Sequence, residues 1–168
     1  MFKSMSVIDV ILNRRSIRKY DDKDIPQDVL ETIMEAGRQS PSAANRQPYH
    51  FIVVTNSEIK KELPGLVSRF IKNAPVVIVG CANPKALLTG KWAAVDTTIA
   101  LENMVLAASS LGIGSCWIGA FNEQKVKDKL QIPESWKIVA LLSLGYPAEN
   151  PGPRKKKERS DLFSFNKF

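Results

Sequence analysis

The chain has few of the side chains that small enzymes use directly for catalysis, with two cysteines and one histidine among its 168 residues. Cys81 and Cys116 lie far apart, and no CxxC pair or Cys/His cluster accompanies them, so we expect neither a zinc site nor a disulfide framework. His50 sits beside apolar neighbours, where a histidine is more often a packed structural residue than a base. A bound cofactor is therefore the expected source of reactivity.

Long hydrophobic runs are also lacking. No segment reaches the ~18 continuous apolar residues of a membrane span, and residues 1–6 lack the apolar stretch of a secretory signal. We expect a cytoplasmic protein that does not enter a membrane. The composition, 44% hydrophobic and 24% charged, is that of a globular protein, and we predict a single domain over residues 1–168.

The formal net charge of +7 is concentrated near the carboxyl end, in the basic segment 154–159. Nucleic-acid binding requires aromatic rings interleaved with such charges. Here the large apolar residues follow the charges, so a solvated charge run is the simpler interpretation and no nucleic-acid partner is expected. Those apolar residues predict that the end of the chain docks on another surface: Leu162, Phe163, Phe165 and Phe168.

Apolar periodicity and capping residues predict alternating helices and strands. We expect helices over 6–14, 26–39, 58–72 (interrupted at Pro64-Gly65), 92–111 and 123–130, and strands over 50–55, 75–81, 115–119 and 137–144. Because the strands are nearly continuous apolar runs, the pattern favours an α/β or α+β fold whose sheet is covered on both faces.

The helix expected over 92–111 has two apolar arcs where a surface helix has one. One arc holds Leu101, Met104, Val105, Ala108 and Leu111, and the other holds Trp92, Val95, Ile99 and Leu106. Two narrow polar strips separate the arcs. Such a helix must be packed on both sides, either inside a larger core or between subunits.

Two segments have the composition of a ligand site. Arg14-Arg15-Ser16-Ile17-Arg18 brings guanidinium groups, whose fixed donor geometry matches phosphate oxygens, together with a hydroxyl. If Ile17 points inward, Ser16 and Arg18 share the opposite side. The loop 41–48 has small residues that let a flat ligand approach, with amide side chains at Asn45 and Gln47. The alternatives are a charged helix end for the first segment and a plain turn for the second.

A third segment, 111–121, contains three glycines but is not a dinucleotide-binding fingerprint. That fingerprint opens a helix after a strand, whereas here the first glycine closes a helix and a strand is expected to follow. Gly119, at the end of this strand, could expose a backbone N–H to a ligand.

Taken together and in this order, the segments 14–20, 41–49, 96–112, 115–119 and 145–149 resemble the nitroreductase family of FMN-dependent oxidoreductases. The resemblance implies an α+β sandwich with a central mixed sheet flanked by helices. It also implies an intertwined homodimer, in which the long helix lies at the interface and the arm 146–168 reaches the neighbouring subunit.

The resemblance further assigns residues to an FMN site. The phosphate and ribityl chain would be held by Arg14, Arg15, Ser16 and Arg18, with additional phosphate contacts from Arg154 and Lys156. The second subunit would line the isoalloxazine with Pro41, Ser42, Ala43 and Asn45, and Gln47 would add a side-chain contact. Backbone groups near the reactive flavin nitrogen would come from Ile118 and Gly119.

The implied activity is a ping-pong transfer of electrons from NADH or NADPH, through FMN, to a nitroaromatic, a quinone or a similar small acceptor. A flavin-binding or storage protein without useful turnover remains an alternative, as do dehalogenating and flavin-degrading chemistries. Only residues 83–91 separate the second strand from the long helix, where larger relatives carry an insertion that covers the flavin. We therefore expect a more open substrate side.

Overall fold

The computed structural model describes residues 6–65 and 67–168. Its centre is a four-stranded sheet with the order β1-β2-β4-β3. The strands are β1 (Tyr49–Val54), β2 (Val76–Ala82), β3 (Gly114–Ile118) and β4 (Lys137–Gly145), which confirms all four sequence predictions to within one residue at each end. The α+β fold is confirmed as well.

The expectation of a mixed sheet is wrong for these four strands, because all three pairings between them are antiparallel. A parallel contact occurs as an isolated bridge between Ser16 and Ser115, where the segment after the first helix runs beside β3. Hydrophobic patterning could not reveal strand direction, since a strand buried on both faces is apolar throughout in either arrangement.

The described residues form five α-helices: α1 (Val7–Asn13), α2 (Gln27–Arg38), α3 (Ser57–Glu62), α4 (Ala93–Ser110) and α5 (Glu123–Leu130). The helix expected over 58–72 is two pieces, α3 and a 3-10 turn at Arg69–Asn73, on either side of Pro64-Gly65. This division agrees with the interruption anticipated there, because proline has no backbone N–H to donate to the preceding helical turn.

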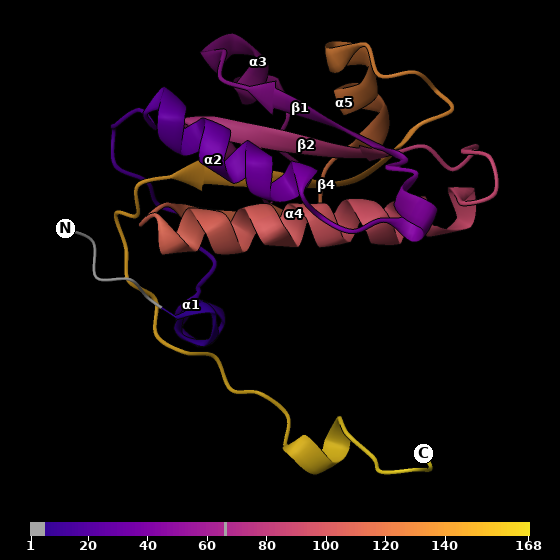
Figure 1. Cartoon of the computed structure of the whole chain (residues 1–168). Coiled ribbons are helices and arrows are strands. Elements are labelled where there is room, and N and C mark those ends of the chain that lie inside the picture. The colour runs from indigo at the N-terminus through magenta and orange to yellow at the C-terminus, as the bar shows by residue number, and fades with distance from the viewer. Residues whose placement is uncertain (1–5, 66) are drawn as a thin grey trace.

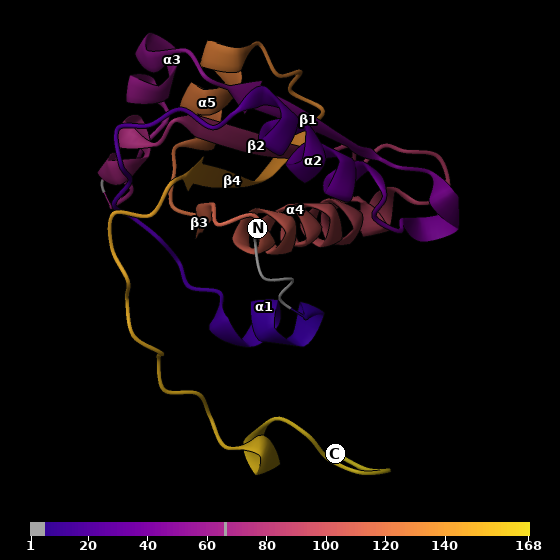
Figure 2. The same cartoon turned by 60° about the vertical axis from the view of Figure 1, so that its left-hand side comes forward.

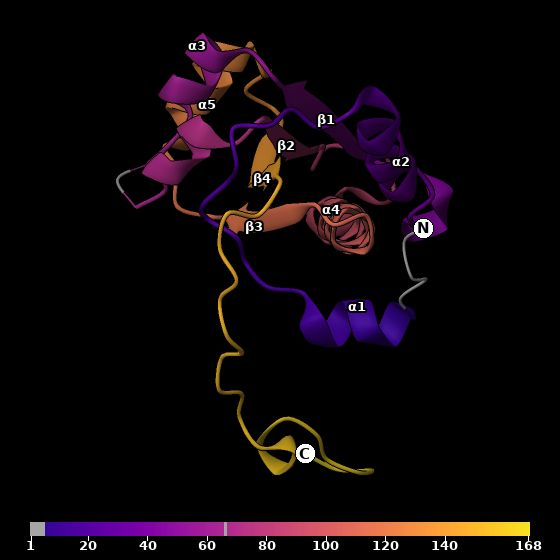
Figure 3. The same cartoon turned by 90° about the vertical axis from the view of Figure 1, so that its left-hand side faces the viewer.

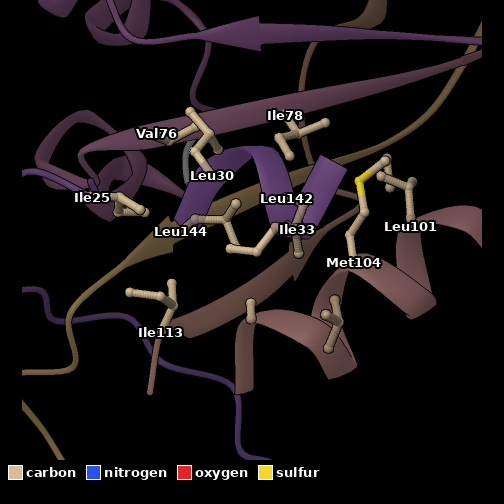
Figure 4. Packing of buried hydrophobic residues seen from close by; sticks show 13 residues of the cluster. Ile25, Leu30, Ile33, Val76, Ile78, Leu101, Met104, Ile113, Leu142 and Leu144 are labelled. Atoms are coloured by element: carbon tan, nitrogen blue, oxygen red, sulfur yellow. The ribbon is translucent and has the colours of Figure 1, made fainter. Parts of the chain in front are cut away.

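Helices cover both faces of the sheet, α2 and α4 on one and α3 and α5 on the other (Figure 1). On the first face, Ile33, Ile78 and Leu142 pack with the inner side of α4 (Figure 4). On the second face, the neighbouring β2 residues Val77 and Val79 join a separate cluster. Successive β2 side chains therefore enter opposite cores, as the alternation of a strand requires.

The two arcs of α4 have different surroundings. Leu101 is completely buried, whereas Trp92, Val95 and Ile99 are 48%, 47% and 36% exposed. Helix α1 lies apart from the sheet on the same side as α4, and the chain after Gly145 extends further in the same direction (Figures 2 and 3). A single subunit thus buries one apolar arc of α4 and leaves the other arc exposed.

Within residues 6–65 and 67–168, no helix combines the length and the apolar character needed to cross a membrane.

Candidate cofactor site

The segment from Arg14 to Tyr20 is fixed against β3. The Ile17 amide donates to the Ser115 carbonyl at 2.9 Å, and the Ile17 side chain is buried. A Cβ added at Gly114 would lie 2.8 Å from Ile17 Cγ1, so this close approach requires glycine. Ile17 does point inward as expected, which leaves Ser16 and Arg18 on the opposite side of the extended backbone.

Two side chains hold this turn in place. The Glu149 carboxylate accepts from the amides of Arg18 and Lys19, at 2.5 and 3.1 Å. The Tyr20 hydroxyl donates to the Ile17 carbonyl at 2.6 Å and lies 2.7 Å from Ser143 Oγ. Burial raises the pKa of Tyr20 far above its usual value, so the hydroxyl stays protonated and remains a donor. The backbone that presents Ser16 and Arg18 is therefore held by buried and charge-assisted hydrogen bonds.

Three of the predicted phosphate-binding residues, Arg14, Arg15 and Ser16, lie beside the start of β3, where Ser16 bridges Ser115. Burial raises the pKa of the Cys116 thiol, while Arg18, Ser16 and Arg14 oppose that shift from nearby. Arg14 and Arg15 also line an open groove of about 510 Å³, together with Gly112 to Ser115 and Pro147 to Asn150. Two guanidinium groups and a hydroxyl around one backbone turn fit the phosphate of FMN.

The end of β3 lies within reach of this cluster. Ile118 is three residues beyond Ser115, a distance of ~10 Å along a strand. The Ile118 side chain is buried, whereas Gly119 is exposed and a Cβ added there would meet nothing within 4 Å. The backbone of Gly119 is thus open to a ligand that extends from the arginine cluster.

The loop over 41–47 is held by α4. Asp96, which is buried, accepts from the Ala43 amide at 3.2 Å with both carboxylate oxygens. Ala44, Asn45 and Gln47 have φ values of 50°, 52° and 49°, in the left-handed region that costs most residues ~1–2 kcal/mol. Such strain persists where the surroundings fix it, and it collects at functional sites.

Sequence reasoning missed the role of Asp96. It lies in one of the two polar strips of the long helix, together with Asn103, whose Nδ2 donates to Ser40 Oγ at 2.7 Å. In the other strip, Glu102 accepts from Trp117 Nε1 at 2.9 Å. The strips therefore anchor the 40–47 loop and β3. The position of the charged Asp96 between two apolar arcs was the sequence feature that could have indicated this role.

One chain does not bring all the predicted residues together. The loop 41–47 is attached to the first turn of α4, whereas β3 begins beyond its last turn (Figure 2). Eighteen residues of α-helix span ~27 Å. Pro41, Ser42, Ala43, Asn45 and Gln47 are therefore remote from Arg14, and Arg154 and Lys156 are exposed on the extended arm.

His50 lies on β1, at the opposite edge of the sheet from β3. Its ring packs edge-on against Trp136, with centroids 6.3 Å apart. It is an exposed residue with an aromatic neighbour, and it takes no part in the arginine cluster.

Known proteins resemble this chain in sequence and in fold. Residues 11–77 and 64–146 match the nitroreductase family. A protein of Methanothermobacter thermautotrophicus, named for NADH dehydrogenase and NAD(P)H nitroreductase activity, is 38% identical over 157 residues, 89% of this chain and 82% of the relative. The FMN reductase (NAD(P)H) of Bacillus subtilis is 31% identical over 175 residues, 89% of this chain and 69% of the relative.

Among solved structures, an FMN-dependent nitroreductase from Clostridium difficile superposes with a TM-score of 0.81 at 30% identity, covering 96% of this chain and 99% of that one. The chain belongs to the nitroreductase family. It is an NAD(P)H oxidoreductase of the nitroreductase and FMN reductase type.

Proposed function

We propose that the chain binds FMN and transfers electrons from NADH or NADPH to a small oxidised acceptor, such as a nitroaromatic or a quinone, in a ping-pong cycle. The observation that carries the proposal is the packing of the Arg14–Arg18 segment on β3: Ser16 bridges Ser115, Arg14 lines the adjoining groove, and the strand ends at the open backbone of Gly119. FMN would supply the hydride chemistry that the side chains lack. The similarity to an FMN reductase and to an FMN-dependent nitroreductase supports the same cofactor.

We infer that the working form is a homodimer. A second copy would bring its own 41–47 loop to the flavin held by the first, which no single chain can do across the length of α4. The exposed apolar side chains of α1, α4 and the arm would then be covered. Interfaces of obligate dimers bury roughly 2,000–5,000 Å², which such an arrangement can supply.

In this arrangement each residue has a defined task. Arg14, Arg15, Ser16 and Arg18 would neutralise and orient the phosphate, with Arg154 and Lys156 adding charge from the arm. The Ile118 and Gly119 backbone would contact the reactive edge of the ring. Positive charge around the ring would favour its reduced, anionic form, which is electrostatic stabilisation by preorganised groups.

The test combines cofactor retention with anaerobic reduction. In the double variant Arg14→Ala and Arg18→Ala, loss of two charge-assisted contacts should raise the FMN dissociation constant at least a hundredfold, about 2.7 kcal/mol. The matched control removes two exposed lysines, Lys85→Ala and Lys137→Ala, and should retain FMN normally. Unchanged retention in the arginine variant would refute the phosphate assignment.

Anaerobic mixing of the FMN-loaded protein with NADH or NADPH should bleach the flavin absorption, and a nitroaromatic or quinone should restore it. A flavin that neither donor bleaches would leave the storage role in place of the oxidoreductase.

A further inference from the structure

A second basic site lies on the other face of the sheet, in the connection between α3 and β2. A pocket of about 520 Å³ is lined by Lys61, Arg69 and Lys72 together with Pro64 and Gly65. Among the described lining residues, three are cationic and none is acidic. The pocket belongs to none of the segments assigned to FMN above.

This pocket is attached to the end of β3. Ser68 Oγ donates to the Ala120 carbonyl at 3.1 Å and accepts from the Gly65 amide at 2.8 Å. A Cβ added at Gly65 would lie 2.5 Å from the Ala120 oxygen, so the two backbones are in contact. Because Ala120 follows Gly119 directly, the basic pocket adjoins the edge proposed to contact the reactive part of the flavin.

The charges of the pocket are largely uncompensated within residues 6–65 and 67–168. Lys61 pairs with Glu58 at 2.7 Å, but both side chains are well exposed, and such surface pairs contribute ~0–1 kcal/mol. Arg69 and Lys72 form no ion pair with any described residue. An anion that enters the pocket would therefore compete, among the described residues, only with Glu58 for Lys61.

We propose that Lys61, Arg69 and Lys72 bind the phosphate groups of the reduced nicotinamide donor while its nicotinamide ring lies over the flavin. The inference rests on the proposed function and adds the recognition of its electron donor. A nicotinamide dinucleotide carries two phosphates, or three when it is phosphorylated on the ribose, whereas quinones and simple nitroaromatics carry none. A cationic pocket beside the redox edge consequently matches the donor.

The experiment uses the FMN-loaded protein and the double variant Lys61→Gln and Lys72→Gln, which leaves Arg69 and all residues assigned to FMN intact. Rapid mixing measures the apparent dissociation constants of NADPH, NADH and reduced nicotinamide mononucleotide, a donor with one phosphate. Loss of two cations should weaken NADPH about tenfold, NADH severalfold and the mononucleotide least. The limiting rate of flavin reduction should not change.

The matched control is Lys137→Glu, which changes the net charge by the same two units at the position paired with Ala82, at the far end of β2 from Lys72. Six residues of β2 separate these ends by ~20 Å. The control should bind all three donors as the parent protein does. The proposal would be overturned if the affinities for all three donors fell equally, or if the control lost as much affinity as the variant. It would also be overturned if only the binding of an anionic acceptor were weakened.

A redox-inert probe separates failure of this inference from failure of the proposed function. Adenosine 2′,5′-bisphosphate should bind the parent protein in calorimetry and bind the Lys61→Gln, Lys72→Gln variant about tenfold more weakly. Protein that binds the probe without oxidising any donor would refute the oxidoreductase proposal and leave the anion site. Protein that oxidises donors yet binds the probe equally in both forms would refute the anion site alone.

Discussion

The two arcs of α4 encounter different surroundings, and the contrast extends to the whole chain. The inner arc is packed between α2 and the sheet, with Leu101 and Val105 fully buried. The outer arc, α1 and the end of the arm leave large apolar side chains exposed, including Ile8, Phe163 and Phe165. Clusters of large exposed apolar side chains mark interaction sites. One chain thus completes its sheet and core, whereas its periphery requires another surface.

The largest expected effect distinguishes the two arcs by stability. Leu101→Ala should lower the free energy of unfolding by about 2–5 kcal/mol, because it removes buried methyl groups and leaves a cavity. Ile99→Ala, on the outer arc, should change the unfolding free energy of the isolated chain by less than ~1 kcal/mol. Chemical denaturation at low protein concentration measures both values. Similar losses in the two variants would remove the distinction between the arcs.

The next largest effect is on thiol reactivity, which should differ between the buried core and the exposed periphery. Burial raises the pKa of Cys81 to about 11, so its thiolate fraction at pH 8 is ~100-fold below that of an ordinary cysteine, and alkylation should be slowed at least in proportion. The rate should rise with pH toward that pKa, since the thiolate is the reacting form. Mass spectrometry of alkylated native protein, with urea-unfolded protein as reference, checks both expectations.

The arm offers the matched control for labelling. Ser164→Cys places a thiol in an exposed segment, where it should react like a free peptide in dilute protein. Protection of this thiol at high protein concentration would be the signature of docking. Rapid labelling at every concentration would contradict the docking of the arm.

Substitution of a residue on the outer arc of α4 should weaken association of two subunits. Trp92→Ala removes a half-exposed indole from the proposed interface, and we expect the dimer dissociation constant to rise about tenfold, about 1.4 kcal/mol. Sedimentation velocity over a concentration series measures it. Glu134→Ala, in an exposed position after α5, is the control and should leave association unchanged. A monomeric parent protein would refute the interface.

The smallest effect concerns the junction between the packed core and the periphery. Tyr20→Phe removes the hydroxyl that holds the Ile17 carbonyl and Ser143, which should cost ~1 kcal/mol of stability. Because the same bond fixes the turn presenting Ser16 and Arg18, FMN should also dissociate severalfold faster. Thermal unfolding and flavin release kinetics together test this, and loss of stability with unchanged flavin release would limit Tyr20 to a structural role.

Much of this architecture could be predicted from local sequence. The four strands, α5 and the two-sided α4 all follow from the spacing and continuity of apolar residues along the chain. The Arg14 to Arg18 cluster was recognisable from residue type, since guanidinium groups and a hydroxyl suit phosphate. The inward orientation of Ile17 followed from alternation along an extended backbone.

Other features depended on contacts between distant parts of the chain. Three such contacts are the antiparallel pairing of β3 with β4, the hydrogen bond between Asp96 and Ala43, and the hydrogen bond between Ser68 and Ala120. Each joins residues about 25 or more positions apart in the sequence. Local patterning carries no information on such pairings, because burial of an apolar strand is equally favourable in either direction. The sequence by itself determined which residues are apolar, flexible or charged, and so which elements form. Only the tertiary structure decided which elements meet, because that depends on how whole faces pack.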